Sequence, residues 1–296
     1  IEGDVNILAQ NHDFYDVGGI SVSLDNTLLA YSEDITGRRI YTIRIKDLKQ
    51  EKNFSEAIEN TTGKIVWVND NEHFFYIRKD ESLRAFQVFR HKVGTPQEED
   101  VLIFHEKDEA FDVGVFKTKS LEYIFIVSSS TISDEHRFIP ADNVFAEWKL
   151  FQKREENLEY AVEHYQNDFY VLTNEGKATN FKLMKTPLSQ TGKEHWQELI
   201  PHRKEVLLEG FEIFKNYLVL EERERGLLQI KIIDNQSGKS WYLPFNDPTY
   251  TAYIGLNLEF DTETLRYGYV SMTTPNSTYE YNMKTQTTKL LKQQEL

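Results

Sequence analysis

The alternation of apolar and polar side chains is the clearest pattern in this chain, and it predicts strands. Within residues 28–46, the second half carries its apolar side chains at Tyr41, Ile43 and Ile45, with polar residues between them. Such a period of two puts every second side chain on one face of a β-strand. Asp34 and Gly37 supply turn chemistry between the two halves of the segment. The segment therefore predicts a β-hairpin with one buried face.

The same hairpin plan returns five more times along the chain. Its equivalent first residues are Leu28, Phe74, Tyr123, Phe169, Tyr217 and Leu265. The intervals between them are roughly 46 to 49 residues, a length typical of propeller-blade repeats. One small four-stranded sheet cannot cover both of its own faces, so such sheets stack on neighbours. The predicted fold is all-β, a β-propeller with six visible units of four strands.

The innermost strand of each unit is expected at residues 20–24, 64–68, 111–116, 160–164, 206–211 and 252–256. A lone outer strand is expected at residues 1–8, and a short helical turn near residues 55–58. No linker rich in proline, glycine or serine interrupts the chain. We therefore expect one propeller domain over residues 1–296.

The composition predicts a globular chain with a large core. Of 296 residues, 40% are hydrophobic and 13% aromatic, yet the mean hydropathy is -0.56 and no long apolar run occurs. A membrane-spanning helix is thereby excluded. Cysteine is absent, which excludes disulfides, thiolate zinc sites and cysteine nucleophiles and fits a reducing compartment. The first residues contain no secretory signal, so a cytoplasmic location is expected.

The net charge of the chain is -14, from 48 acidic and 34 basic residues. An acidic surface argues against general binding of nucleic acid, which depends on neutralising phosphates, and it favours cationic partners. The alternative is that the charge serves solubility alone, as it does in most acidic proteins of this kind.

Motifs that carry catalytic chemistry are missing from the sequence. No Gly-x-Ser-x-Gly elbow occurs, and neither Gly-x-Gly-x-x-Gly nor a P-loop is present. The eight histidines show no spacing that would hold a metal ion. The sequence therefore predicts no catalytic residue, no metal and no cofactor.

The densest charged segment, Glu-Glu-Arg-Glu-Arg-Gly at residues 221–226, falls at the turn of the fifth hairpin. Residues 33–39 of the first hairpin hold a similar mixture at the same place in the repeat. Two such tips would offer ion-pairing surface to another domain, and the alternative is a solvated tip with internal pairs. The candidate contacts are Asp13, Arg38, Arg39, Glu221, Arg223 and Arg225.

Several short runs together carry a family resemblance. They are Leu-Val-Leu-Glu-Glu-Arg at 218–223, Ser-Met-Thr-Thr-Pro at 271–275, Phe-Asn-Asp-Pro at 245–248 and Phe-Arg-His-Lys-Val-Gly-Thr at 89–95. The set resembles the propeller of the prolyl oligopeptidase family, and more closely its protease II, or oligopeptidase B, branch. The resemblance covers nearly the whole chain.

This resemblance implies a serine peptidase that cuts short peptides after Arg or Lys, in which a propeller lids the active site of an α/β-hydrolase domain and limits substrate size. The hydrolase domain is absent from this sequence, and the family propeller has seven blades where six units are counted here. We therefore expect the non-catalytic propeller portion of such an enzyme, inactive alone, whose partners are the missing hydrolase domain and short basic peptides. The alternative is a stand-alone propeller that scaffolds a partner or binds a small ligand at its axis.

Overall fold

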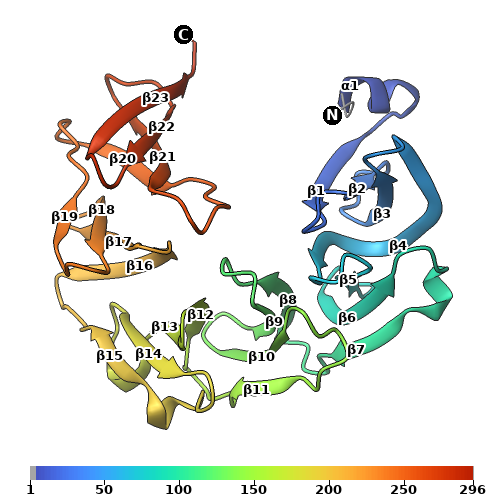
Figure 1. Cartoon of the computed structure of the whole chain (residues 1–296), viewed down its shortest axis with the longest axis horizontal. Coiled ribbons are helices and arrows are strands. Elements are labelled where there is room, and N and C mark those ends of the chain that lie inside the picture. Colours follow the sequence, from blue (N-terminus) through green and yellow to red (C-terminus); the bar gives the residue numbers. More distant parts are fainter. Residues whose placement is uncertain (1–4, 296) are drawn as a thin grey trace. The chain divides into compact units, whose positions relative to one another are not determined.

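The computed structural model describes residues 5–295, and its regular structure is almost entirely antiparallel strand (Figure 1). The chain divides into two compact units, Ile1–Asn157 and Leu158–Leu296. Among the described residues, no helix is long and apolar enough to cross a bilayer.

The first unit holds a seven-stranded and a four-stranded sheet. The larger has the order β1 (Asp16–Val22), β2 (Leu28–Asp34), β3 (Tyr41–Asp47), β4 (Lys52–Trp67), β5 (His73–Lys79), β6 (Ala85–Lys92) and β7 (Val101–His105). The smaller is built from β8 (Asp112–Lys117), β9 (Tyr123–Ser129), β10 (Asp134–Pro140) and β11 (Lys149–Gln152).

The second unit holds three four-stranded sheets. The first contains β12 (Tyr160–Tyr165), β13 (Asp168–Thr173), β14 (Lys182–Pro187) and β15 (Gln197–Ile200). The second contains β16 (Val206–Ile213), β17 (Tyr217–Glu224), β18 (Leu227–Asp234) and β19 (Ser240–Tyr242). The third contains β20 (Tyr250–Ile254), β21 (Thr264–Ser271), β22 (Ser277–Asn282) and β23 (Thr287–Gln293).

The six predicted repeats match this architecture. Each predicted first residue lies within one residue of the start of the second strand of a unit, namely β2, β5, β9, β13, β17 and β21. The predicted innermost strands overlap β1, the end of β4, β8, β12, β16 and β20. The all-β prediction of four-stranded units is confirmed.

The strand β4 joins the first two repeats, which the sequence analysis had treated as separate. Its first part pairs with β3, where Ile43 faces Ile58, and its last part pairs with β5, where Val66 faces Phe75. Between them the backbone bends at Asn60 and Gly63, whose φ angles are 58° and 86°. In Figure 1 this strand is the broad curved ribbon between β3 and β5. Two predicted strands are therefore one bent strand that belongs to two repeats of the first unit.

Alternating burial builds the core between neighbouring sheets. In β18 the side chains of Leu228, Ile230 and Ile232 are buried, and the residues between them are more exposed. These three belong to the cluster that joins the second and third sheets of the second unit. Burial of such a side chain contributes about 1.5 to 3 kcal/mol. The period of two read from the sequence thus becomes sheet-on-sheet packing.

Two local predictions were wrong. Val5–Leu8 is a short helix, followed by the 3-10 turn Ala9–Asn11, instead of a strand, and residues 1–4 lie outside the described residues. In the described chain β1 is the edge strand of its sheet, and residues 5–8 add no further strand to it. Residues 55–58 belong to β4 because Arg44 and Ile43 of β3 pair with Ala57 and Ile58. Tertiary pairing overrides local propensity there.

Candidate functional site

In each repeat, the hairpin that joins the second and third strands turns at the same edge of its own sheet, which we call the tip edge of that sheet. In the first unit these hairpins are residues 35–40, 80–84 and 130–133. The first two lie side by side, because Thr61 of β4 pairs with both Tyr41 and Arg78. The Nζ atom of Lys79 also donates to the carbonyl oxygen of Arg39, at 2.5 Å.

The first tip is shaped by Asp34, whose side chain is only 1% exposed. Its carboxylate accepts hydrogen bonds from the backbone N–H groups of Thr36 (2.8 Å), Gly37 (3.0 Å) and Arg39 (2.7 Å). Burial raises the pKa of Asp34, but these hydrogen bonds more than offset it, and the pKa lies below its ordinary value. The acid of this tip therefore holds the loop and is not available to a partner.

The arginines of the first tip remain available. The side chains of Arg38 and Arg39 are exposed and have no ionic partner within residues 5–295. Burial, and then the charge of Arg39, hold the pKa of Lys79 below its ordinary value. Asp13 is exposed in the approach to β1. This tip is a basic surface on an acidic protein.

The fifth hairpin turns more tightly than its sequence suggested. Arg225 and Gly226 form a two-residue connection with φ angles of 51° and 84°. Two residues of positive φ match the twist of the flanking strands. Glu221 and Arg223 consequently lie in β17, and of the three candidate residues only Arg225 stands exposed at the turn.

Neighbouring acids in β17 point to opposite faces of the sheet. Glu221 accepts a hydrogen bond from the backbone N–H of Ile254 in the third sheet, at 2.6 Å. Burial, and the charges of nearby acids, hold the pKa of Glu221 above its ordinary value. Glu222 is 1% exposed and binds Arg203 at 2.6 and 3.1 Å and the hydroxyl of Tyr242 at 2.8 Å. Both acids tie their sheet to neighbouring segments.

Arg223 also has an internal partner. Its guanidinium donates to both carboxylate oxygens of Glu209 on β16, at 2.5 and 3.0 Å. The side chains are 41% and 28% exposed, so the pair contributes no more than about 1 kcal/mol. Of the six candidate contacts, Glu221 and Arg223 have partners inside the second unit, whereas the side chains of Asp13, Arg38, Arg39 and Arg225 are exposed.

Sequence reasoning missed an ionic cluster at the tip edge of the first unit. The guanidinium of Arg154 donates to Glu106 at 2.5 Å, lies 3.7 Å from Asp108, and stacks 3.6 Å above the ring of Phe111. Arg84 donates to the carbonyl oxygens of Asp108 and Phe111, at 3.1 and 3.0 Å. Arg154 and Glu106 are 48 residues apart, and no motif links them. The cluster fixes the segment between β7 and β8.

The tip edges also carry exposed apolar side chains that the sequence reading missed. In the first unit, Ile35, Leu83 and Ile132 are 47%, 43% and 45% exposed. In the second unit, Met272 is 93% exposed. Each follows the first residue of its repeat by roughly 7 to 9 positions, a regularity that could have revealed them. Apolar groups among arginines are typical of protein interfaces.

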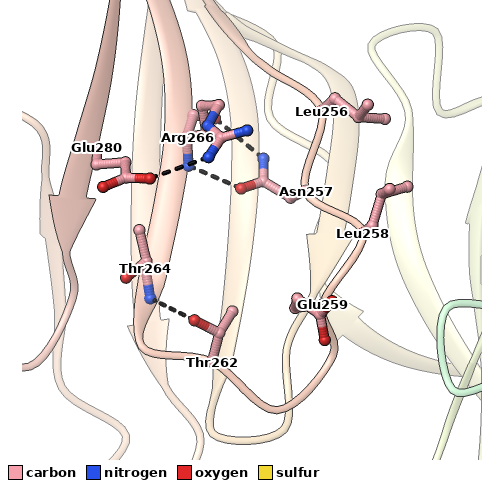
Figure 2. Close-up of a pocket in the computed structure, with 8 residues that line it drawn as sticks. All are labelled: Leu256, Asn257, Leu258, Glu259, Thr262, Thr264, Arg266 and Glu280. Carbon is pink, nitrogen blue, oxygen red and sulfur yellow. Dashed lines mark hydrogen bonds and ion pairs between the residues drawn. The ribbon is translucent and has the colours of Figure 1, made fainter. Parts of the chain in front are cut away.

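A pocket of about 410 Å³ lies on the third sheet of the second unit (Figure 2). The side chain of Asn257 binds the backbone N–H and carbonyl of Arg266, at 2.7 and 3.0 Å. Arg266 in turn pairs with Glu280 at 3.0 Å. Leu256 and Leu258 are 69% and 74% exposed beside it. The pocket holds no nucleophile paired with a base, so its groups support binding and not covalent catalysis.

One buried histidine of the first unit has a carboxylate partner. His91 is fully buried and pairs with Asp100 at 2.7 Å, as in a catalytic dyad, but its other ring nitrogen lies 3.6 Å from Glu56 instead of a serine. Within residues 5–295, no three His, Cys, Asp or Glu side chains gather as metal ligands.

Comparison with known proteins identifies the fold. Residues 4–294 match the family model described as "Prolyl oligopeptidase, N-terminal beta-propeller domain". The chain belongs to the prolyl oligopeptidase family. The β-propeller fold and the resemblance read from the sequence are thereby confirmed.

Relatives of this prolyl oligopeptidase propeller include whole peptidases. Dipeptidyl aminopeptidase BI of Pseudoxanthomonas mexicana is 38% identical over 98% of the chain, and Protease 2 of Moraxella lacunata is 32% identical over 95%. The structure of oligopeptidase B from Leishmania major matches 99% of the chain with a TM-score of 0.92 and 28% identity. The chain spans 40% of the length of both curated relatives and 42% of that structure.

Proposed function

We propose that this chain is the propeller portion of a serine oligopeptidase that cleaves short peptides after Arg or Lys. In this role residues 1–296 act as one propeller domain that covers the active site of an α/β-hydrolase domain and restricts the size of peptides that enter. The names of its relatives Protease 2 and oligopeptidase B support a peptidase of this branch. A reducing, cytoplasmic compartment fits the absence of cysteine.

The tip edge is the surface that we assign to the hydrolase domain, and the free charges there are the observation that carries the proposal. Arg38, Arg39 and Arg225 hold exposed charges without internal ion pairs among the described residues. Exposed apolar side chains at the tip edges of the individual sheets add the contact area that charge alone does not provide. Asp13, Glu221 and Arg223 stay in the proposed set, although the last two also serve the second unit internally.

The acidity of the chain supports the basic substrate class. A propeller of net charge -14 beside the active site would raise the local concentration of cationic peptides. Such steering weakens as the Debye length falls from about 30 Å at 0.01 M salt to about 8 Å at 0.15 M. If the acidity serves solubility alone, kcat/KM should show no dependence on the charge of the substrate.

The test is to replace the matching propeller of dipeptidyl aminopeptidase BI with this chain and to assay the chimera. We expect cleavage after Arg or Lys in short peptides, little cleavage of long ones, and a steeper salt dependence of kcat/KM for a dibasic than for a monobasic peptide. The chain alone should not hydrolyse either peptide. Equal cleavage after apolar residues, or activity of the isolated chain, would contradict the proposal.

A second candidate function is the release of dipeptides from the free N-terminus of a peptide. The name of the relative dipeptidyl aminopeptidase BI favours it. The same chimera separates the two candidates. Acetylation of the peptide N-terminus should abolish release of dipeptides, whereas an endopeptidase that selects Arg or Lys should still cut the acetylated peptide.

A further inference from the structure

The chain contains three methionines and no cysteine, and the three methionines differ sharply in exposure. Met184 and Met283 are 6% and 1% exposed, and Met283 belongs to the core cluster of the last two sheets. Met272 is 93% exposed, the highest value among the exposed large apolar residues of the described chain. One sulfur atom is therefore presented to solvent while the other two are enclosed.

The backbone around Met272 is fixed although its side chain is not packed. The N–H of Ser271 donates to the carbonyl of Thr274 at 3.0 Å, and the Ser271 hydroxyl accepts from the N–H groups of Thr273 and Thr274 at 3.2 and 3.1 Å. Asp247 accepts from the hydroxyls of Thr273 and Tyr269, at 3.2 and 2.5 Å. The hairpin between β21 and β22 thus holds Met272 outward without depending on its thioether.

We propose that Met272 is a site of oxidative modification that controls docking at the tip edge. A peroxide transfers one oxygen atom to the thioether sulfur, the sulfur loses two electrons, and the peroxide O–O bond breaks to leave water or an alcohol. The product is a sulfoxide, which is polar where the thioether was apolar. Methionine sulfoxide reductases reverse the step.

The consequence for docking rests on the proposed function. A sulfoxide at position 272, on the tip edge of the third sheet of the second unit, must be desolvated before the hydrolase domain covers it, which disfavours the covered state. A docked hydrolase domain would in turn shield the sulfur from peroxide. Oxidation therefore occurs in the undocked state and slows its return to the docked state.

The first experiment needs only the 296-residue chain, so its outcome is independent of the proposed function. The chain is treated with limiting hydrogen peroxide, digested, and each methionine peptide is examined by mass spectrometry for a gained oxygen atom. We expect about tenfold more sulfoxide at Met272 than at either buried methionine, with an unchanged far-UV spectrum. Equal oxidation of all three, or loss of the β spectrum as Met272 is oxidised, would overturn the proposal.

The second experiment measures the dissociation constant for the separately produced hydrolase portion of dipeptidyl aminopeptidase BI. Oxidised wild type and Met272→Gln, whose polar side chain imitates the sulfoxide, should both bind about threefold to tenfold more weakly than untreated wild type. Met272→Leu keeps an apolar side chain without sulfur. Its dissociation constant should therefore equal that of untreated wild type, and peroxide should not change it. If peroxide weakens binding of Met272→Leu to the hydrolase portion as it does for wild type, another residue causes the effect. The proposed control of docking by Met272, which we call the docking half of the proposal, is then refuted.

An untreated chain that does not bind the hydrolase portion would contradict the proposed function and the docking half together. The first experiment alone would still decide whether Met272 is oxidised preferentially.

Discussion

The first and the fifth hairpins occupy the same place in the repeat and have similar charged sequences, yet they use their charges differently. In the first, Asp34 turns inward to bind backbone N–H groups, and Arg38 and Arg39 remain exposed. In the fifth, the turn is only two residues long, so the acids fall within β17 and bind neighbouring segments. The length of the loop, and not the composition of the tip, decides which charges stay available to a partner.

The largest expected effect is at the buried acid of the fifth hairpin. Glu222→Gln removes the charge that balances Arg203, so the free energy of unfolding should fall by about 3 kcal/mol, the lower end for a buried pair because Arg203 keeps 30% exposure. Urea unfolding of the chain measures this loss. Glu224→Gln, two residues further along the same strand, is the matched control and should change little. A loss under about 1 kcal/mol at Glu222 would show that the pair is not structural.

The acid of the first hairpin should show a smaller effect that depends on pH. In Asp34→Asn an amide N–H faces the backbone N–H of Arg39, so the free energy of unfolding at neutral pH should fall by about 2 kcal/mol. The folded-state pKa of Asp34 lies below its unfolded value of about 3.9, so its stabilisation is present above that value and is lost as pH falls through the folded pKa.

Urea midpoints measured between about pH 6 and pH 2 check this prediction. The difference between wild type and Asp34→Asn should narrow as the pH falls through the acidic range. Asp13→Asn is the control, because Asp13 is exposed and should not alter the profile. A difference that stays constant over the whole range would mean that the ionised form of Asp34 is not the stabilising one.

Replacement of the exposed arginines should have the smallest effect on the free energy of unfolding. Its main effect should be on binding of the partner domain. Arg38→Ala, Arg39→Ala and Arg225→Ala should each change the free energy of unfolding by less than about 0.5 kcal/mol. Each should weaken binding of a separately produced hydrolase domain by about twofold to fivefold, and less at high salt. Arg223→Ala breaks the pair with Glu209 and should cost the chain up to about 1 kcal/mol by itself. Equal stability losses at all four would make the arginines structural.

The repeat architecture could be predicted from the sequence because strand alternation and turn chemistry are local signals. The six repeat starts needed only the period of two and an interval of roughly 46 to 49 residues. The bend that makes β4 one strand depends on pairing with β3 and β5 together, which no local pattern contains.

The ionic contacts of the site could not be predicted for the same reason. Glu222 binds Arg203 and Tyr242, which are 19 and 20 residues away in the sequence. Arg154 binds Glu106, which is 48 residues away. Which acid of a charged run turns inward depends on where the strand ends. That boundary is set at Arg225 and Gly226 by backbone conformations which the sequence permits but does not specify.

The most direct test of the central claim is hydrogen–deuterium exchange of the 296-residue chain with and without the separately produced hydrolase domain. If the tip edge is the docking surface, backbone amides of residues 35–40, 80–84 and 130–133 should be protected when the domain is present. The turns at residues 23–27, 68–72 and 118–122 join the first and second strands and should exchange at an unchanged rate. Protection of those turns in place of the tips, or of neither, would contradict the account.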